Sequence, residues 1–381
     1  MSRLPNAGAG RVRRAVLGAV LILALGSAAR AAAPPAEPAV PVPALFETPP
    51  VAGAGDAADD MAIWVNRDDR SQSLIIGTDK KAGNLEVYDL KGERLQVVPD
   101  PNHSVNNVDI RYDFPLAGGW ADIVVSGGSD VQVYRIDPVA RRLVDVTAGP
   151  IRAAYDAWGV CLYHSLISGR YYVFTQANNG MVQQLELFDN GAGKAAARSV
   201  RGPWDVDPAN PKVEDGEIEA CVVDDTTGDY YVAEQDVAVW RYAAEPGGST
   251  TDRTAVLTTY LYNGGDLVPD IEGLTIVHDE FASYLLASSQ GDSTFGLYLL
   301  DESRAPYPLI DKFRVTGGPL ADGCSVTDGI DAQPLSLGPD FPHGLFVCQD
   351  NTNSAPGSAG HQDFKLVPLE RIIPWVNPYG V

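Results

Sequence analysis

The sequence predicts an all-β fold, a six-bladed β-propeller with four-stranded antiparallel blades. A pattern of one polar, usually acidic residue followed by a short apolar run occurs six times, at intervals of 47, 51, 61, 53 and 56 residues. No segment shows a sustained helical period. A repeat of about 50 residues made of short strands is typical of propellers, in which each repeat forms one blade. The copies begin at Asp60, Asn107, Trp158, Glu219, Glu272 and Asp328.

Each repeat continues with further β-rich runs, which Gly, Asn, Asp and Pro residues separate. The apolar run of each copy is expected to form the inner strand. Second strands are expected at 74–78, 122–126, 171–175, 230–233, 284–288 and 344–348. Third strands are expected at 85–88, 131–136, 182–188, 237–242, 295–300 and 364–368. Weaker outer strands are expected at 94–98, 143–146, 197–201, 254–260 and 309–315.

The two ends of the chain bear on how the ring closes and where the domain begins. The last repeat has no clear outer strand, so we expect Ala44–Val51 to supply an N-terminal strand closing the last blade and removing an open edge. Residues 1–33 read as a signal peptide, with arginines before an apolar run and a small-residue end. The alternative, a membrane anchor, is disfavoured because Ala15–Gly26 is shorter than the roughly 20 residues that span a bilayer. Residues 34–43 read as a Pro/Ala linker and 44–381 as a single propeller domain.

The charge of the chain limits its partners. It is −22 overall, and loss of the five arginines of the predicted leader, which has no acidic residue, would make it −27. Nucleic acid and anionic membranes are poor partners for such a surface, so we expect neither a nucleic-acid partner nor a membrane span. The excess of acidic residues can be explained by solubility alone. A more specific explanation is that many of the carboxylates bind hard cations. We expect a monomer that is secreted or periplasmic after cleavage of the leader.

The four cysteines allow three pairings, and export permits disulfides. Cys324 precedes an inner strand and Cys348 ends the strand that returns beside it. Antiparallel neighbours bring these two points to the same edge, so Cys324–Cys348 is the favoured pair. Cys161 and Cys221 lie in successive repeats and form the second candidate pair.

Inner strands of a propeller begin at one face and second strands return to it, so their ends share a rim. The inner strands and the residues nearby contribute Asp59, Asp60, Asn107, Glu219, Asp270, Glu272, Asp328 and Asp331. The second strands contribute Asp79, Lys80, Lys81, Asn178, Asn179, Glu234, Asp236, Asp292, Asp350 and Asn351. Clustered carboxylates repel each other unless cations bind, and Ca²⁺ accepts 6–8 oxygen ligands in irregular geometry. A single acidic residue at a strand end can be explained by its hydrogen bonds to turn amides. Acidic residues that recur at the same position of several repeats instead favour the binding of several calcium ions.

Other chemistries find less support. The five histidines are scattered without the paired spacing of a zinc site. The sequence has neither a G-x-S-x-G elbow nor a P-loop. Catalysis would therefore use a metal-activated water. Lys80 and Lys81 are either an ordinary solvated pair or an anion site beside metals, which suits phosphate.

Eight stretches of the chain resemble the β-propeller phytases, the calcium-dependent alkaline phytases. They cover nearly all of Ala44–Ile373. They are DAADDMAIWVN (56–66), LIIGTDKKAGNLEVYDL (74–90), NNVDIRYDFPL (106–116), CLYHSLISGRYY (161–172), DIEGLTI (270–276), YLLASSQGDS (284–293), TDGID (327–331) and FKLVPLERI (364–372).

The resemblance implies a six-bladed propeller with several Ca²⁺ ions on one face and two neighbouring phosphate sites. It implies hydrolysis of phosphomonoesters of calcium-phytate, that is myo-inositol hexakisphosphate, by a metal-activated water. Two alternatives stay open: a calcium-dependent propeller that binds phytate or another polyanion with little turnover, and a propeller hydrolase of lactones or other esters.

The resemblance also assigns roles to individual residues. The implied calcium ligands are Asp60, Glu219, Asp270, Glu272 and Asp328, with Asp59, Asp109 and Asp331 in flanking positions of the motifs. The implied phosphate-binding residues are Lys80, Lys81, Asn106 and Asn107. Glu219, Asp270, Glu272 and Lys80 are the expected catalytic residues.

The chain departs from the family at several places. No arginine stands in Gly127–Asp130, where the family has one, and Asn178 replaces a lysine. Each lost charge-assisted hydrogen bond is worth roughly 1.5–3 kcal/mol, so two losses could cost on the order of 10² in transition-state binding. The remaining departures are Trp158 for a tyrosine, Gln235 for a glutamate, Ala220 for a glycine and Val326 for an aspartate. The resemblance therefore supports metal binding more strongly than rapid cleavage.

Overall fold

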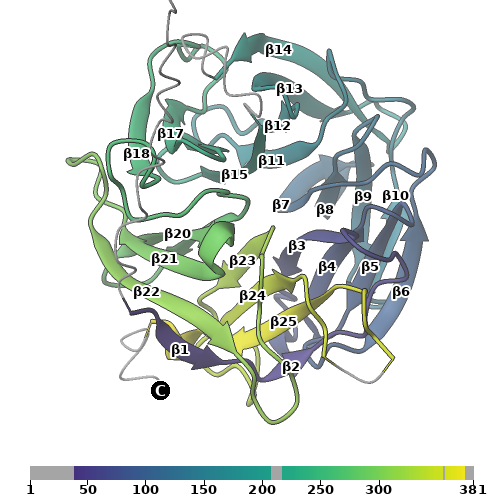
Figure 1. The fold of residues 1–381 in the computed structure, drawn as a ribbon. Helices are drawn as coiled ribbons and strands as arrows, with labels where there is room; N and C mark the ends of the chain where they lie inside the picture. Colours follow the sequence, from purple (N-terminus) through teal and green to yellow (C-terminus); the bar gives the residue numbers. More distant parts are fainter. Residues whose placement is uncertain (1–37, 207–216, 355–356, 374–381) are drawn as a thin grey trace, which may run out of the picture. The chain divides into compact units, whose positions relative to one another are not determined.

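The computed structural model describes residues 38–206, 217–354 and 357–373. These residues form six β-sheets arranged as the blades of a propeller, with the inner strands nearest the centre (Figure 1). The predicted fold class is confirmed. The predicted signal peptide and residues 34–37 of the predicted linker lie outside the described residues.

Each blade is an antiparallel sheet of four strands that follow one another in sequence, except where the N-terminal segment joins in. Blades one to three are β3 (Ala58–Trp64), β4 (Leu74–Asp79), β5 (Asn84–Tyr88), β6 (Arg94–Pro99); β7 (Val108–Leu116), β8 (Gly119–Ser126), β9 (Gln132–Asp137), β10 (Arg142–Asp145); and β11 (Gly159–His164), β12 (Tyr171–Gln176), β13 (Met181–Asp189), β14 (Ala195–Asp205). Blades four to six are β15 (Ile218–Asp224), β16 (Asp229–Glu234), β17 (Ala238–Ala243), β18 (Thr254–Thr258); β19 (Leu274–His278), β20 (Ser283–Ser289), β21 (Thr294–Leu299), β22 (Leu309–Thr316); and β23 (Ile330–Gln333), β24 (Leu345–Asp350), β25 (Asp363–Pro368).

The fourth strand of blade six comes from the start of the domain. Strand β2 (Phe46–Glu47) pairs antiparallel with β25, Phe46 opposite Leu366 and Glu47 opposite Lys365. Backbone bonds from Leu45 and Thr48 to β25, of 2.8 and 3.0 Å, extend this ladder by one residue at each end. The predicted N-terminal closing strand is confirmed, and it is shorter than the segment Ala44–Val51 that was expected to supply it.

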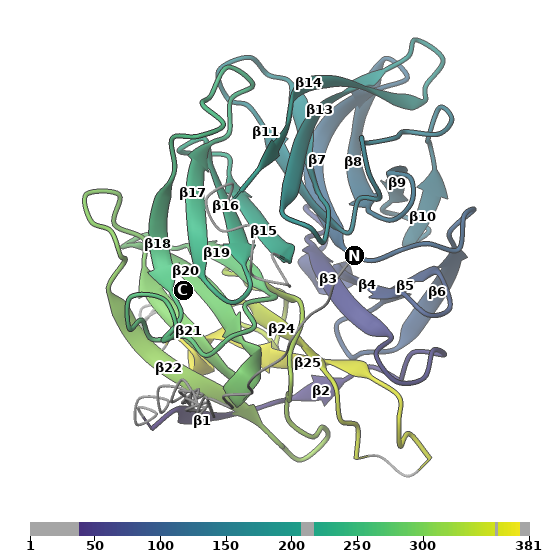
Figure 2. The same cartoon turned by 45° about the horizontal axis from the view of Figure 1, so that its top comes forward.

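One part of the predicted linker forms a strand instead. β1 (Val40–Pro43) pairs in parallel with β22, which gives blade five a fifth strand at its outer edge (Figure 2). The Pro/Ala composition suggested a linker, but an outer edge tolerates proline because only one side of the strand needs N–H donors. Val42 is 2% exposed, so this strand also contributes to the core.

The core consists of six apolar clusters, one at each junction between neighbouring blades. At the junction of blades five and six, Phe295, Phe313 and Phe346 pack with ring centroids 5.1–5.7 Å apart. The alternation of inward and outward side chains along each strand supplies both faces of a blade. Among the described residues, no helix has the length and apolar character to cross a membrane.

Both candidate disulfides are present. Cys324 pairs with Cys348 within blade six, and Cys161 pairs with Cys221 across the inner strands of blades three and four, with Cα–Cα distances of 6.5 and 6.0 Å. The favoured pair is confirmed, and so is the second one. Disulfides are typical of proteins folded in oxidising compartments.

Replacing Cys161 and Cys221 together by alanine is expected to lower the free energy of unfolding by about 4 kcal/mol. The reason is that the bridge closes a loop of 60 residues in the unfolded chain. Chemical denaturation of the double variant beside the parent protein measures this difference. A loss below about 1 kcal/mol would show that the bridge does not constrain the unfolded state as expected.

Candidate metal and phosphate site

Two of the rim carboxylates lie in backbone irregularities of their inner strands. β3 and β15 each have a register shift against the second strand of the blade, between Ala58 and Met61 and between Ile218 and Cys221. A β-bulge of this kind re-aims the side chains within it. Asp59 and Glu219 lie in these two irregular stretches, so two blades present a carboxylate at equivalent places.

Glycines beside the rim acids let the inner strands approach closely. A Cβ on Gly273 would lie 2.5 Å from the carbonyl oxygen of Asp328, and one on Gly329 would lie 2.2 Å from Asp60 Oδ1. Neither position can hold a larger residue without backbone movement. The small second residue in these copies of the repeat is therefore what brings acidic groups of neighbouring blades together.

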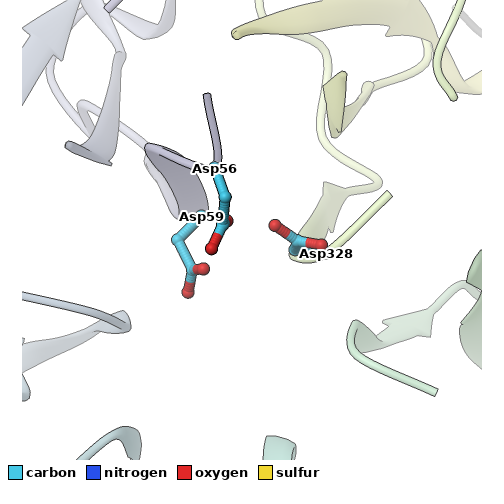
Figure 3. A group of neighbouring side chains, drawn as sticks. All are labelled: Asp56, Asp59 and Asp328. Carbon is cyan, nitrogen blue, oxygen red and sulfur yellow. The ribbon is translucent and has the colours of Figure 1, made fainter. Parts of the chain in front are cut away.

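The centre of the rim is a group of three carboxylates. Asp56, Asp59 and Asp328 each offer an oxygen, and the three oxygens lie within 4.8 Å of one another. Asp56 and Asp59 come from one segment and Asp328 approaches from another (Figure 3). Asp59 and Asp328 are buried and Asp56 is exposed. A set of ligands made only of carboxylate oxygens suits a hard cation such as Ca²⁺.

Asn106 and Lys80 connect this group to Glu219. The side-chain amide of Asn106 donates to Asp59 Oδ2 at 3.1 Å and also to a Glu219 carboxylate oxygen. Lys80 Nζ forms ion pairs with Asp56 and Asp59 at 2.8 and 2.7 Å. The structure thus brings together Asp59, Lys80, Asn106, Glu219 and Asp328 from the predicted site.

Sequence reasoning did not single out Gln290, which joins two other acids of the rim. Gln290 lies in the 3₁₀ turn η2 (Gln290–Asp292), and its amide donates to Asp328 Oδ1 at 2.7 Å and to a Glu272 carboxylate oxygen. Gln290 falls within residues 284–293, a stretch that resembles the phytases, and this resemblance was the feature of the sequence that could have identified it. Because its side chain is an uncharged amide, a search for acidic residues does not find it.

The electrostatics of the rim favour a bound cation. Burial raises the pKa of Glu219 and Asp328 well above the usual range, and the charge of Asp59 raises both further. Burial also raises the pKa of Glu272 to about 8, and the charge of Glu219 acts in the same direction. Burial raises the pKa of Asp59 too, although Lys80 opposes this shift. These groups are poorly stable as anions unless a cation joins them.

Three predicted metal ligands, Asp60, Asp109 and Asp331, lie apart from this group and line the axis of the propeller around a cavity of about 50 Å³. Each carboxylate accepts a backbone N–H of a neighbouring inner strand, from Val108 at 3.1 Å, Leu162 at 2.7 Å and Ile63 at 2.8 Å respectively.

The hydrogen bonds that Asp60, Asp109 and Asp331 accept join the inner strands of neighbouring blades. Asp109 also forms an ion pair with Arg111 at 3.1 Å.

Asp270, another predicted metal ligand, precedes β19. Its backbone carbonyl accepts the N–H of Gln290 at 3.0 Å.

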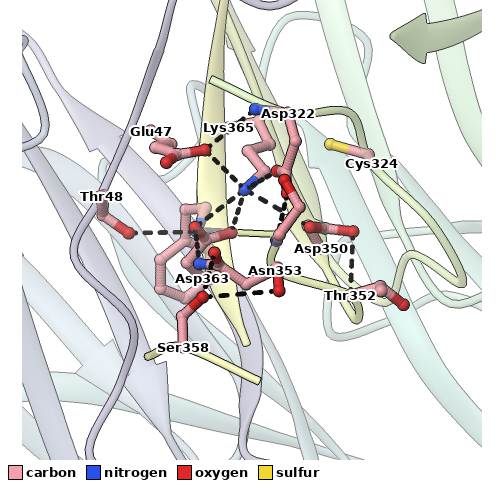
Figure 4. Close-up of polar contacts among 12 residues, drawn as sticks. Glu47, Thr48, Asp322, Cys324, Asp350, Thr352, Asn353, Ser358, Asp363 and Lys365 are labelled. Atoms are coloured by element: carbon pink, nitrogen blue, oxygen red, sulfur yellow. Dashed lines mark hydrogen bonds and ion pairs between the residues drawn. The ribbon is translucent and has the colours of Figure 1, made fainter. Parts of the chain in front are cut away.

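Asp350, expected on the rim, belongs to a different cluster in blade six (Figure 4). The Nζ of Lys365, a fully buried residue, pairs with Asp363 at 2.7 Å, Glu47 at 3.0 Å and Asp350 at 3.4 Å, and also with Asp322. Glu47 is in β2 and Lys365 in β25, so these ion pairs cross the closure of the ring.

Beside the rim lies a cleft of about 300 Å³. Its lining includes Lys80, Lys81 and Asn106 together with Trp158. Asn107 lines the axial cavity instead. Asn178, which replaces the family lysine, is exposed at a turn and does not line the cleft. The cleft thus places cationic and amide donors next to the carboxylates.

Comparison with known proteins agrees with this arrangement. The family model described as Phytase matches residues 11–377. The chain belongs to the phytase family. The predicted family and its class, the phosphoric monoester hydrolases, are confirmed. The chain is also similar to the 3-phytase of Bacillus subtilis strain 168, with 38% identity over 340 residues, which cover 87% of this chain and 84% of the relative.

A solved structure shares the fold of this phytase-family chain. A calcium-binding protein, regucalcin, from Agrobacterium tumefaciens strain C58 superposes with a TM-score of 0.51 at 10% identity. The match covers 87% of this chain and 97% of that one. At this identity the likeness shows the propeller fold alone.

Proposed function

We propose that this protein is a secreted, calcium-dependent phytase that releases phosphate from myo-inositol hexakisphosphate. The observation that carries the proposal is the juxtaposition of a buried carboxylate group, around Asp59 and Asp328, with the cleft that holds Lys80 and Lys81. The family supports phosphomonoester hydrolysis, and the two disulfides and the predicted signal peptide support export.

The residues of the rim fit calcium. The oxygens of Asp56, Asp59 and Asp328, which come from the start of blade one and the start of blade six, lie within 4.8 Å of one another, and this group contains no nitrogen or sulfur ligand. We assign the calcium-binding role to Asp56, Asp59, Glu219, Glu272 and Asp328. Calcium would supply charge neutralisation, polarisation of phosphoryl oxygens and a water of lowered pKa. Asp60, Asp109 and Asp331 are assigned a role in joining the inner strands.

The chain's own cations and amides bind and orient the substrate. Burial lowers the pKa of Lys80, but attraction to Asp59 and Asp56 outweighs this, so the pKa is raised above the usual range. Lys80 therefore remains an ammonium that can donate to phosphate oxygens and stabilise charge that develops on them. Asn106 holds Asp59 and Glu219 in a fixed relation, and Lys81 extends the cationic wall of the cleft.

Calcium-dependent binding of phytate without rapid turnover is the second candidate. It is favoured by the absence of a cationic side chain at Gly127 and Gly128. A Cβ on Gly128 would lie 1.6 Å from the carbonyl oxygen of Ser104, and one on Gly127 would lie 2.3 Å from that of Ala157. Close packing of three loops thus excludes an arginine at these two positions.

Two measurements on the same protein separate these candidates. Phosphate released from myo-inositol hexakisphosphate is measured in calcium-containing buffer at alkaline pH, and heat of binding is measured by titration calorimetry. A phytase gives steady release of phosphate over many turnovers. Binding heat without phosphate release would reject the phytase proposal in favour of the binding protein.

Replacing Gln290 by leucine is expected to raise the calcium concentration needed for half-maximal phosphate release about 10-fold. Residues that orient metal ligands typically contribute 10–100-fold in affinity, and Gln290 bridges Glu272 and Asp328. Calcium titrations of activity in the parent protein and the variant measure the change. An unaltered calcium requirement would show that the bridge does not tune the site.

A further inference from the structure

We propose that His103 is a phosphate-binding residue of the substrate cleft, whose imidazole donates a hydrogen bond to the substrate. The inference rests on the proposed function, because it concerns the same cleft and the same polyanionic substrate. His103 shares the lining of the cleft of about 300 Å³ with Lys80, Lys81, Ser104, Asn106 and Trp158. Neither the family resemblance nor the acidic rim assigns it a role.

A tight turn fixes His103 at the edge of this cleft. Its backbone N–H donates to the carbonyl of Asp100 at 3.0 Å. The Asp100 carboxylate accepts the N–H groups of Asn102 and Ser104 at 2.8 and 3.3 Å. His103 has a φ of 50°, in the left-handed region that residues other than glycine adopt uncommonly. Hydrogen bonds on both sides of the histidine therefore fix the backbone from which the imidazole extends.

Neighbouring loops hold this turn in place. A Cβ on Gly83 would lie 2.6 Å from the Cα of His103, so the loop after β4 packs directly against it. On the other side, Asn106 N–H donates to the carbonyl of Gly127 at 2.9 Å, and Ala157 N–H donates to that of Gly128 at 2.7 Å. The loops before β7, after β8 and before β11 are therefore joined into one rigid wall of the cleft.

The charges around the cleft leave room for another donor. Lys80 is already paired with Asp56 and Asp59, so part of its donor capacity is committed. Lys81 is exposed, and the cleft also contains the carboxylate of Asp156. Gly127 and Gly128 bring no side-chain donor to this wall, and the imidazole of His103 would supply one.

Two carboxylates lie behind the histidine rather than in the cleft. Asp100 caps its own turn, as described above. Asp130 accepts from Asn102 at 3.3 Å and pairs with Arg152 at 3.0 Å. Burial raises the pKa of the Asp100 carboxyl, and His103 is close enough to act on it electrostatically in the opposite direction. Among the described residues no hydrogen bond joins the imidazole to either carboxylate, so its N–H remains available to a ligand in the cleft.

The test compares the parent protein with His103→Leu and His103→Lys at saturating calcium. Leucine removes the donor, and lysine supplies another donor at the same place. We expect His103→Leu to raise KM for myo-inositol hexakisphosphate about 5-fold, the worth of one exposed hydrogen bond to phosphate. His103→Lys is expected to keep KM within 2-fold of the parent value, with kcat within 2-fold in every case.

Equal KM values for all three proteins would overturn the inference. So would an equal loss of kcat in both variants, because that pattern indicates only a disturbed turn. The affinity of the three proteins for myo-inositol hexakisphosphate is also measured by calorimetry. If the parent protein binds the ligand but releases no phosphate, the proposed function fails while the ranking of affinities still decides the role of His103.

Discussion

The calcium-free protein is expected to lose stability as the pH rises from about 5 to about 9, and calcium is expected to abolish this loss. Burial raises the pKa of Glu272 to about 8 in the folded protein. Unfolded carboxyls titrate near pH 4, so the folded state binds more protons between these two pH values. Stability therefore falls as Glu272 ionises, by about 1.4 kcal/mol for each unit of pKa shift.

Calcium reverses the effect because it binds the ionised carboxylates of the folded state. A single site at a calcium concentration 100 times its Kd adds about 2.7 kcal/mol, and several sites add more. Thermal unfolding at both pH values, with calcium and with a chelator, measures the four stabilities. A Tm that is insensitive to chelator at alkaline pH would contradict the assignment of the rim as a calcium site.

Replacing Glu219 by glutamine is expected to lower kcat for phosphate release at least about 100-fold, or about 2.7 kcal/mol in activation free energy. The change removes an anionic metal ligand beside Asp59, while the glutamine carbonyl oxygen can still accept from the Asn106 amide. The same variant is expected to be more stable than the parent in calcium-free buffer, because it removes one charge from a repulsive group.

The matched control for this variant is Glu302→Gln, which removes the same charge from an exposed position. It should leave kcat within 2-fold of the parent. Phosphate release under saturating calcium and thermal unfolding under chelation are measured for all three proteins. Loss of activity together with loss of calcium-free stability would indicate that Glu219 has a structural role instead.

The fold could be predicted in detail because the repeat fixes one blade at a time. The spacing from Asp60 to Asp328 gave the number of blades, and the need to remove an open edge led to the closing strand in Ala44–Val51. Strand β1 (Val40–Pro43) was missed because two prolines in four residues resemble a linker. Composition does not tell whether a neighbouring edge is available for such a segment.

The candidate site was predicted less completely, since adjacent residues of one strand can have different roles. Asp59 joins the carboxylate group while the carboxylate of Asp60 accepts the backbone N–H of Val108, although both residues lie in the same bulge. Asp331 lies in the same stretch, TDGID, as Asp328, yet its carboxylate accepts a hydrogen bond from the backbone N–H of Ile63. Residues without charge, such as Gln290, carry no acidic signal and become visible only through their contacts.

In the proposed function, calcium bound at the carboxylate rim is required for phosphate release. This requirement is tested by the rate of phosphate release from myo-inositol hexakisphosphate as free calcium is varied with a calcium buffer at alkaline pH. We expect a saturable rise from a rate close to zero, with recovery of activity when calcium is returned to the chelated protein. Phosphate release that continues at the full rate in excess chelator would show that calcium is not required.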